Sequence, residues 1–174
     1  MHDDSRLARF EQAILPHLNA AYNLARWLTR RDQDAEDVVQ EAYLRAFQFF
    51  GSFRGGDGRT WLLTIVRNTC YTWLRKNRVT EQSASFEEEK HSPAFADSNP
   101  EAILLRAEDA EMLRKTLGEL PAEYREVLVL RELEELSYKE LAQVTGMPIG
   151  TVMSRLARGR ERLQQLLIER HERE

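Results

Sequence analysis

Apolar residues recur at helical spacing through most of this chain, and no segment alternates apolar and polar residues as a half-buried strand does. The spacing predicts helices over 6–30, 34–50, 60–78 and 101–117, a further helix starting at Pro121, and two helices within 138–166. Pro16 interrupts the first pattern, because a proline inside a helix removes a backbone hydrogen bond and clashes with the preceding turn. That stretch is therefore one kinked helix or two, and the fold class is all-α.

The helix over 60–78 has two distinct faces. Thr64, Arg67, Asn68, Tyr71 and Arg75 share the side opposite its apolar stripe. The stripe that we expect to be buried consists of Trp61, Leu62, Ile65, Val66, Thr69, Cys70, Trp73 and Leu74. An aromatic ring beside arginines suits single-stranded nucleic acid, since the ring stacks on a base and the arginines hold phosphates. A solvated face with one tyrosine explains the composition equally well.

The segment over 136–166 has the plan of a helix-turn-helix. Ser137 and Glu140 form an S-x-x-E capping box, which starts a helix at Tyr138. Gly146 permits the left-handed conformation that ends a helix, and Pro148 cannot continue one. A second, arginine-rich helix begins near Ile149. The helix before the motif has apolar residues that we expect to pack beneath it, namely Val127, Leu128, Leu130 and Leu133. The plan indicates duplex DNA, although a plain helical hairpin with solvated arginines has the same pattern.

The composition changes between Val79 and Pro100, where the chain is acidic, contains prolines and lacks an apolar period. This stretch is typical of a linker. About 22 residues at roughly 3.3 Å each can span some 70 Å when extended, which is enough to connect two separated DNA sites. We therefore expect two small helical domains, over 1–79 and 101–174, joined by a flexible acidic linker over 80–100.

The charge and cysteine content narrow the class of protein. A net charge of -4 excludes a generally basic nucleic-acid coat protein, so any DNA contact must come from local patches. Neither an 18-residue apolar run nor a signal peptide is present, which predicts a cytoplasmic protein without membrane insertion. The single cysteine, Cys70, cannot form an internal disulfide and lies on an apolar helical face, where we expect a small buried hydrophobe.

The chain offers little for catalysis. The glycine-rich segment over 51–59 must be a loop, but it has neither nucleotide-binding glycine spacing nor a preceding strand. The four histidines are scattered, and no histidine or cysteine spacing suits a metal. We therefore expect no catalytic residue, no metal, no cofactor and no enzymatic activity.

Two stretches together carry a resemblance to a known family. The segment DAEDVVQEAYLRAFQFFGSFRGGDGRTWLLTIVRNTCYTWLRKNR, over 34–78, and the segment LPAEYREVLVLRELEELSYKELAQVTGMPIGTVMSRLARGRERL, over 120–163, resemble the bacterial sigma-70 family. They are most similar to its extracytoplasmic-function (ECF) group, which keeps only the sigma-2 and sigma-4 domains. The resemblance implies a promoter-recognition subunit whose partners are core RNA polymerase and promoter DNA. Many members are held inactive by an anti-sigma factor, which adds a further candidate partner.

The resemblance also implies roles for individual residues. The helix that starts with D-A-E-D-x-V-Q-E docks on the polymerase clamp in the family, which makes its polar strip the expected polymerase-binding site: Asp34, Asp37, Gln40, Glu41 and Arg45. In the family, the glycine-rich loop and the helix after it capture a base flipped out of the minus-10 element. Extruding a base costs free energy, which the protein must compensate by stacking and by hydrogen bonds to the base edge. With the polar face of that helix, the expected minus-10 residues are Ser52, Phe53, Arg54, Gly55, Asp57, Arg59, Thr60, Arg67, Asn68 and Tyr71.

The second helix of the helix-turn-helix enters the major groove at the minus-35 element in the family. The matching positions here are Tyr138, Thr151, Met153, Ser154, Arg155, Ala157 and Arg158. Thr151 suits phosphate and Arg158 suits base edges. Met153 departs from members that have arginine there, and it cannot make a bidentate contact with guanine, so no particular minus-35 sequence follows.

Three functions remain open at this point. The first is a sigma factor, whose linker, with Glu87, Glu88 and Glu89, would thread a basic polymerase channel as in the family. The second is a stand-alone regulator that binds duplex DNA, which would leave the glycine-rich loop and the Asn68 face without a role. The third is a sigma-like interaction module in which DNA binding is vestigial.

Overall fold

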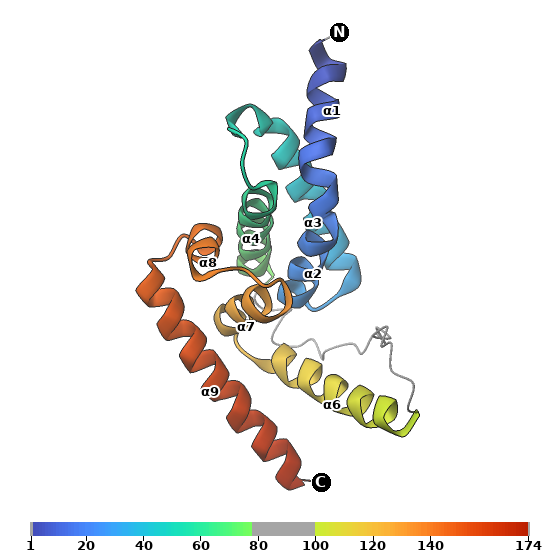
Figure 1. The fold of residues 1–174 in the computed structure, drawn as a ribbon, viewed down its shortest axis with the longest axis vertical. Helices are drawn as coiled ribbons and strands as arrows, with labels where there is room; N and C mark the ends of the chain where they lie inside the picture. The colour runs from blue at the N-terminus through green and yellow to red at the C-terminus, as the bar shows by residue number, and fades with distance from the viewer. Residues whose placement is uncertain (1, 78–99, 174) are drawn as a thin grey trace.

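A computed structural model describes residues 2–77 and 100–173, and every regular element within these residues is helical. The prediction of an all-α fold is confirmed. Figure 1 shows the order of the elements, which are α1 (His2–Ile14), a 3-10 turn η1 (Leu15–His17), α2 (Leu18–Thr29), α3 (Asp32–Gln48), a 3-10 turn η2 (Phe50–Ser52), α4 (Gly58–Lys76), α6 (Pro100–Glu119), α7 (Ala122–Leu128), a π turn η3 (Val129–Leu133), α8 (Tyr138–Thr145) and α9 (Ile149–Arg173).

The N-terminal half is built from α2, α3 and α4, with α1 extending beyond them (Figure 1). Pro16 divides the first helical stretch into two helices joined by η1. Of the two predicted alternatives, one kinked helix or two helices, the second is therefore correct. Helix α3 begins at Asp32, two residues earlier than predicted. The Asp32 carboxylate accepts hydrogen bonds from Tyr22 (3.0 Å) and Arg26, and these bonds hold the start of α3 against α2.

An aromatic cluster fixes the end of α3 and the loop that follows. The Phe10 ring of α1 meets the rings of Tyr43, Phe47 and Phe50 edge to face, with centroids 5.0 to 5.3 Å apart. Phe50 in turn stacks on Phe53 at 5.6 Å, and Phe53 lies 5.2 Å from Trp61 of α4. Edge-to-face pairs are preferred aromatic geometries, so this cluster stabilises the loop beyond its simple burial.

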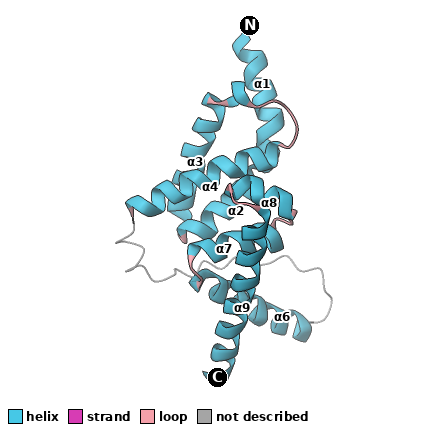
Figure 2. Cartoon of the chain, turned by 90° about the vertical axis from the view of Figure 1, so that its left-hand side faces the viewer, coloured by secondary structure: helices cyan, strands magenta, loops and turns pink. Residues whose placement is uncertain are grey.

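In the C-terminal half, α7 packs on α9, and α8 lies at the upper end of α9 (Figures 1 and 2). The backbone N–H of Glu134 bonds to the carbonyl of Val129 (3.1 Å), five residues back, so the chain makes a π turn between α7 and α8. Val127, Leu128 and Leu130 are buried as predicted, whereas Leu133 is 54% exposed. The prediction for Leu133 is wrong because the wider turn moves that position off the buried face.

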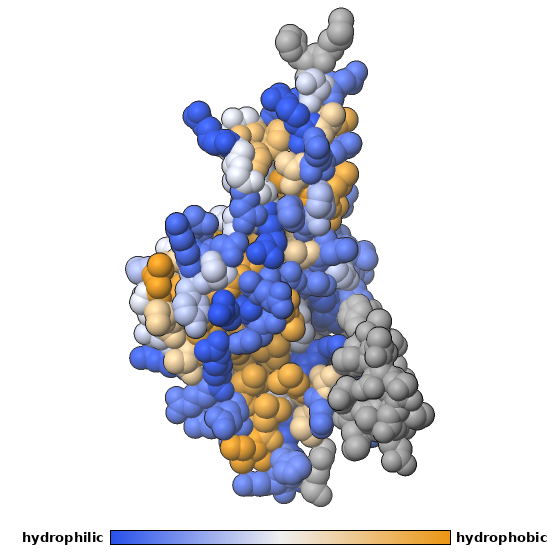
Figure 3. Space-filling view, in the orientation of Figure 1, coloured by the Kyte–Doolittle hydropathy of each residue, from blue (hydrophilic) through white to orange (hydrophobic). Residues whose placement is uncertain are grey.

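Helices α6 and α9 lie below the core and contact each other, with Arg170 of α9 donating to Glu119 of α6, and apolar side chains gather on the surface there (Figures 1 and 3). Leu117 of α6 is buried, but Leu113 on the same helix is 45% exposed and Ile168 of α9 is 51% exposed. Some apolar residues of the helical pattern of α6 are therefore exposed rather than packed against the core.

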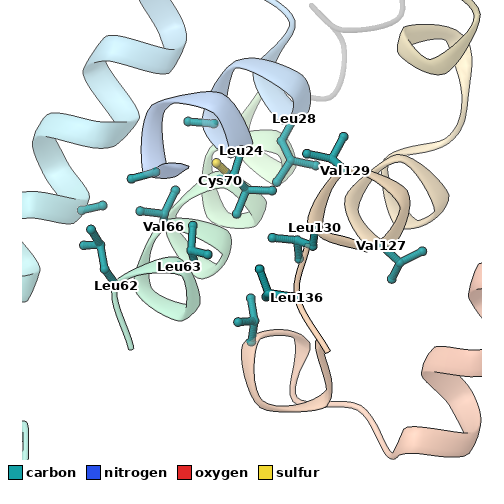
Figure 4. Packing of buried hydrophobic residues seen from close by; sticks show 14 of the residues in the cluster. Leu24, Leu28, Leu62, Leu63, Val66, Cys70, Val127, Val129, Leu130 and Leu136 are labelled. Atoms are coloured by element: carbon teal, nitrogen blue, oxygen red, sulfur yellow. The ribbon is translucent and has the colours of Figure 1, made fainter. Parts of the chain in front are cut away.

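The two halves share one hydrophobic core. Leu24, Leu28 and Leu63 of the N-terminal half pack with Val129, Leu130 and Leu136 of the C-terminal half, as Figure 4 shows. Leu63 is fully buried although it lies outside the predicted stripe of its helix, because α4 also contacts α8. Cys70 is buried in the same core, as predicted.

The predicted linker over 80–100, including Glu87, Glu88 and Glu89, lies outside the described residues except for Pro100. The division at 79 and 101 therefore stays a prediction. None of the helices in the described ranges is both long enough and apolar enough to cross a membrane.

Candidate nucleic-acid and polymerase interfaces

The polar strip of α3 borders an apolar groove. Asp37, Gln40 and Glu41 are exposed, Asp34 and Arg45 are half-buried, and Arg45 donates to Glu41 at 2.7 Å. Gln40 also lines a groove of about 460 Å³ whose other walls are mostly apolar: Leu15, Leu18, Tyr22, Glu36, Val39 and Tyr43. Val39 and Tyr43 of α3 are both half-buried on this groove. An acidic strip beside an apolar groove is a surface suited to a protein partner.

The glycine-rich loop presents polar groups and backbone from a fixed base. Gly55 and Gly56 have φ of +81° and +90°, a conformation that side chains other than glycine rarely adopt. The Ser52 hydroxyl donates to the carbonyl of Phe49 (2.6 Å), and the Asp57 carboxylate caps α4 by accepting from the N–H of Arg59 (3.0 Å). Ser52, Arg54, Gly55 and Asp57 are exposed, and the Phe53 ring is held in the aromatic cluster.

Thr60 lies inside the start of α4 rather than on the loop surface. Its side chain is buried, and its hydroxyl donates to the carbonyl of Asp57 (3.2 Å). The Thr60 hydroxyl is therefore bonded to the backbone at the start of α4, and its role at the minus-10 element stays a prediction.

The sequence indicated that the polar face of α4 is exposed. In the structure, α7 covers part of this face. The Arg67 side chain donates to the Glu126 carboxylate of α7, and the Tyr71 hydroxyl donates to the second oxygen of that carboxylate (2.8 Å). The Arg67 guanidinium also lies over the Tyr71 ring, 4.3 Å from its centroid. Glu126 is fully buried, while Asn68 and Arg75 remain exposed.

This cluster sets the protonation states of its members. Burial opposes the charged form of Arg67, but the hydrogen bond and the charge of Glu126 more than offset this and raise the pKa of Arg67. Burial, together with the Glu126 carboxylate, raises the pKa of Tyr71 well above its ordinary value. Arg67 is therefore a fixed cation at neutral pH, and Tyr71 is a neutral O–H donor.

Arg59 also reaches the C-terminal half. Its guanidinium donates to the carbonyl of Glu134 (3.1 Å) and to the carboxylate of Glu140 (3.3 Å). Glu140 accepts the backbone N–H of Ser137 (2.9 Å), and this bond, against the opposing effect of burial, lowers the pKa of Glu140. Three of the expected minus-10 residues, Arg59, Arg67 and Tyr71, thus contact the C-terminal half.

The helix-turn-helix has the predicted geometry. Both hydrogen bonds of the Ser137 and Glu140 capping box are present, Gly146 ends α8 with φ of +71°, and α9 begins at Ile149. On α9, Val152 and Leu156 are buried, which turns the opposite side of the same turns outward. That outward side carries Thr151, Met153, Ser154, Ala157 and Arg158, all exposed, with Arg155 half-buried beside them.

Two expected minus-35 residues have contacts of their own. Tyr138 is half-buried, and the guanidinium of Arg131 lies 4.6 Å from the centroid of its ring. Met153 is 50% exposed near the start of α9, where it presents an apolar side chain to solvent. The open face of α9 is therefore mixed in chemistry, with hydroxyls, methyl groups and the guanidinium of Arg158.

Comparison with known proteins places this geometry in a family. The family model described as "Sigma-70 region 2" matches residues 13–80, and that described as "Sigma-70, region 4" matches residues 110–163. The RNA polymerase sigma-H factor of Pseudomonas aeruginosa is 36% identical over 91% of this chain and 86% of its own length. The ECF RNA polymerase sigma-E factor of Escherichia coli K12 is 38% identical over 74% of this chain and 71% of its own length. The chain belongs to the sigma-70 family, in its ECF group.

The function of this ECF-group chain is accordingly the initiation of transcription at promoters. A longer relative, the ECF RNA polymerase sigma factor SigE of Mycolicibacterium smegmatis, is 32% identical over 95% of this chain, which spans 64% of the length of that protein. The predictions of a sigma-70 resemblance and of this function are confirmed.

Two solved structures share the fold. The sigma factor RpoE from Bartonella quintana, solved in complex with the anti-sigma factor NepR, is 33% identical and has a TM-score of 0.72, with 91% of this chain and 96% of that chain covered. CnrH, solved in complex with the cytosolic domain of CnrY, is 27% identical and has a TM-score of 0.62, with 92% and 88% covered.

The sequence reasoning missed the two buried charges that join the halves of this sigma-70 family chain. Arg125 is fully buried and donates to the carbonyls of Leu120 (2.8 Å) and Leu28 (3.1 Å), while Glu126 binds α4. The continuous apolar run over 127–130 could have indicated that this part of the helix is surrounded by protein, because a helix that is apolar on all sides is buried on all sides. Charged residues directly before such a run must then find partners inside the protein.

Proposed function

We propose that this chain directs core RNA polymerase to promoters with two elements, reading the minus-35 element as duplex and the minus-10 element as melted strand. The observation that carries the proposal is the open face of α9, where Thr151, Met153, Ser154, Ala157 and Arg158 all face outward from a capped helix-turn-helix. An exposed second helix of this kind fits the major groove of duplex DNA.

At the minus-35 element, the proposed contacts differ in kind along α9. Thr151 and the backbone N–H groups of the first turn suit phosphate, and these fix the register without reading sequence. Arg158 is the candidate for base edges, with Tyr138 and Ser154 as further polar contacts and Arg155 beside the phosphates. Met153 and Ala157 offer apolar contact, for which the methyl group of thymine is the natural partner in the major groove.

At the minus-10 element, the glycine-rich loop and Asn68 are the proposed site for an extruded base. The loop supplies backbone groups at Gly55 and side chains at Ser52, Arg54 and Asp57, and Asn68 is exposed on the helix that follows. An extruded base costs a few kcal/mol, which edge hydrogen bonds and stacking must compensate.

Asn68→Ala should impair promoter opening while leaving duplex binding intact, because Asn68 lies on α4 and away from α9. The measurement is permanganate reactivity of unpaired thymines in the complex with polymerase. Asn19→Ala, at an exposed asparagine of α2, is the matched control, and a normal open complex from Asn68→Ala would remove Asn68 from the site.

For polymerase binding, we propose the polar strip of α3 together with its neighbouring groove. Asp37, Gln40 and Glu41 are exposed with Asp34 and Arg45 at their sides, and the groove supplies apolar area next to them. A mixed surface of this kind, with apolar anchors and a charged rim, is typical of protein interfaces.

The remaining features of the proposal concern the whole chain. We infer a sigma-2-like domain over 1–79, a linker over 80–100 and a sigma-4-like domain over 101–174, acting in the cytoplasm and without catalysis of its own. An anti-sigma factor is a further proposed partner, supported by the two similar sigma factors that were solved with NepR and with CnrY. The apolar surface between α6 and α9 is a candidate area for a protein partner, since exposed apolar patches mark such sites (Figure 3).

Run-off transcription on fragmented genomic DNA tests the proposal. Core RNA polymerase is assayed with and without the purified chain, and transcript starts are mapped by sequencing. New starts that share two spaced upstream elements are the expected result. Absence of new starts with an active core enzyme would contradict the sigma function and favour a regulator that binds duplex DNA alone.

A further inference from the structure

Helix α1 contacts the chain on both sides of the glycine-rich loop (Figures 1 and 2). At the end of α3, before the loop, the Arg6 guanidinium donates to the carbonyls of Phe47 (3.1 Å) and Gln48 (3.4 Å). At the start of α4, after the loop, Gly58 lies so close to α1 that an added Cβ would be 2.5 Å from the carbonyl oxygen of Ala13. Both ends of the loop are therefore held by one helix.

The contact of Arg6 fixes the point at which α3 ends. The last carbonyls of a helix have no partner inside it, and they form the negative end of the helix dipole. The Arg6 guanidinium satisfies two of these carbonyls and also lies over the Phe47 ring, 5.5 Å from its centroid. The start of the loop is therefore tied to α1 by hydrogen bonds, charge and a ring contact.

Two paths lead from these anchors to the loop residues themselves. One is aromatic, because the Phe10 ring of α1 meets Phe50 at 5.3 Å and Phe50 stacks on Phe53 at 5.6 Å. The other follows the backbone, where the Phe49 carbonyl accepts both the N–H (2.9 Å) and the hydroxyl (2.6 Å) of Ser52. Both paths end at residues proposed to bind the minus-10 element, Ser52 and Phe53.

The anchoring side chains precede the part of the chain that the family model covers. The model of sigma-70 region 2 matches from residue 13 onward, whereas Arg6 and Phe10 lie in the first three turns of α1. These two residues are therefore not among those by which the chain matches the family.

We propose that α1 anchors the glycine-rich loop, with Arg6 and Phe10 as positioning residues that set the pocket for the extruded minus-10 base. This role rests on the proposed function of the loop at the minus-10 element. A site that reads one base must be held within about 0.5 Å of its productive geometry. A loosened loop should therefore accept wrong bases more readily, while promoter opening itself continues.

Substitutions in α1 test the anchoring role. Arg6→Ala removes the guanidinium, Arg6→Lys keeps a cation that can still donate to the α3 carbonyls, and Phe10→Leu keeps the core apolar without the ring. Arg9→Ala is the matched control, because Arg9 is an exposed arginine of the same helix. The full-length chains are compared first by hydrogen–deuterium exchange at the amides of Ser52 and Phe53, which bond to the carbonyls of residues 49 and 50. With core polymerase, they are then compared on the promoter obtained by run-off transcription and on its single-base minus-10 variants.

We expect Arg6→Ala and Phe10→Leu to speed exchange at these two amides about tenfold, with unchanged helical dichroism. The preference for the parental base at the extruded position should fall by about tenfold, because the pocket is displaced, and the preference at minus-35 positions should stay parental. Arg6→Lys should recover most of both effects, and Arg9→Ala should behave as the parent.

Three results would overturn the anchoring role. Parental exchange with parental base preference would show that α1 does not hold the loop. Faster exchange with parental base preference would make the contact purely structural. A lost preference with parental exchange would make Arg6 a direct DNA contact.

The two readouts also separate this proposal from the sigma function. If no chain, the parent included, supports transcription while exchange still responds to Arg6→Ala, the sigma function is removed and the anchoring of the loop by α1 remains. Normal transcription with parental exchange and parental base preference removes the anchoring role alone.

Discussion

Gly58 begins α4 at the point where that helix crosses the end of α1. A Cβ atom at this position would lie 2.5 Å from the backbone carbonyl oxygen of Ala13, which cannot move without shifting α1. Gly58→Ala should therefore lower the free energy of unfolding by about 1 to 3 kcal/mol, as overpacking does elsewhere. Urea denaturation measures the change.

Gly150→Ala is the control for that substitution. Gly150 also lies in the first turn of a helix, but nothing is within 4 Å of its added Cβ. Alanine favours helix over glycine by up to about 1 kcal/mol, so this variant should be as stable as the parent or slightly more stable. Equal destabilisation of both variants would contradict the close approach of α4 to α1.

Arg158 is the exposed guanidinium of the open face of α9. If it reads a base edge, as proposed, Arg158→Ala should cost roughly 1 to 3 kcal/mol in promoter binding and relax specificity at one minus-35 position. The measurement is polymerase-dependent binding to promoters with each base substituted in turn. Gln165→Ala, an exposed residue two turns later, is the control, and an equal loss on every sequence would assign Arg158 to phosphate.

At the scale of elements, Glu140 links the start of α8 to the charge of Arg59. Its lowered pKa means that the folded state favours the ionised form, so Glu140 stabilises the fold above its unfolded pKa of about 4.3. This contribution is lost as the pH falls through the folded pKa. The stability advantage of the parent over Glu140→Gln should therefore be constant above about pH 5 and shrink below about pH 4.

Urea unfolding of both chains between pH 3 and pH 7 is the measurement for Glu140. Glu161→Gln removes an exposed glutamate of α9 outside any helix cap, and it corrects for the general effect of one less negative charge. A constant difference between parent and Glu140→Gln across the whole range would show that the capping box does not depend on the charge.

Elements were predictable where local chemistry determines them. The capping box at Ser137, the left-handed Gly146 and the break at Pro16 act within a few residues, so the sequence alone located them. The π turn was not predictable from the apolar period, because one residue beyond the regular spacing changes the face on which every later side chain lies. Leu133 was therefore placed on the wrong side.

For the whole molecule, the halves and their family could be predicted, but their contact could not. The sequence pattern assigned Arg67 and Tyr71 to an exposed face because the residue that covers them, Glu126, is 55 residues or more away along the chain. Contacts at that separation leave no local period. The exposed face of α9, by contrast, follows from the buried Val152 and Leu156 on the same helix.

A shared core predicts that the two halves unfold together. All three tryptophans, Trp27, Trp61 and Trp73, lie in the N-terminal half, whereas helices contribute to far-UV dichroism throughout. Urea transitions followed by tryptophan fluorescence and by dichroism should therefore coincide, as coincident probes do in a cooperative unit. A dichroism transition that precedes the fluorescence change would show that the C-terminal half unfolds separately.

Leu130 and Leu133 give a matched pair for the same core. Leu130 is fully buried and Leu133 is largely exposed, although they are three residues apart. Leu130→Ala should lower the free energy of unfolding by about 2 to 5 kcal/mol and move both transitions, while Leu133→Ala should stay within about 0.5 kcal/mol of the parent. Similar costs for the two variants would contradict the π turn.

The π turn at Val129–Leu133 also has a consequence for how such chains diverge. A π turn holds one residue more than an α turn, so the deletion of one residue here would leave a regular turn and shorten the path from α7 to α8. The carbonyl of Glu134 and the carboxylate of Glu140, which both bind Arg59, would then have to shift. A single codon lost at this place would thus disturb the contact between the two halves, which a substitution on the exposed face of α9 leaves in place.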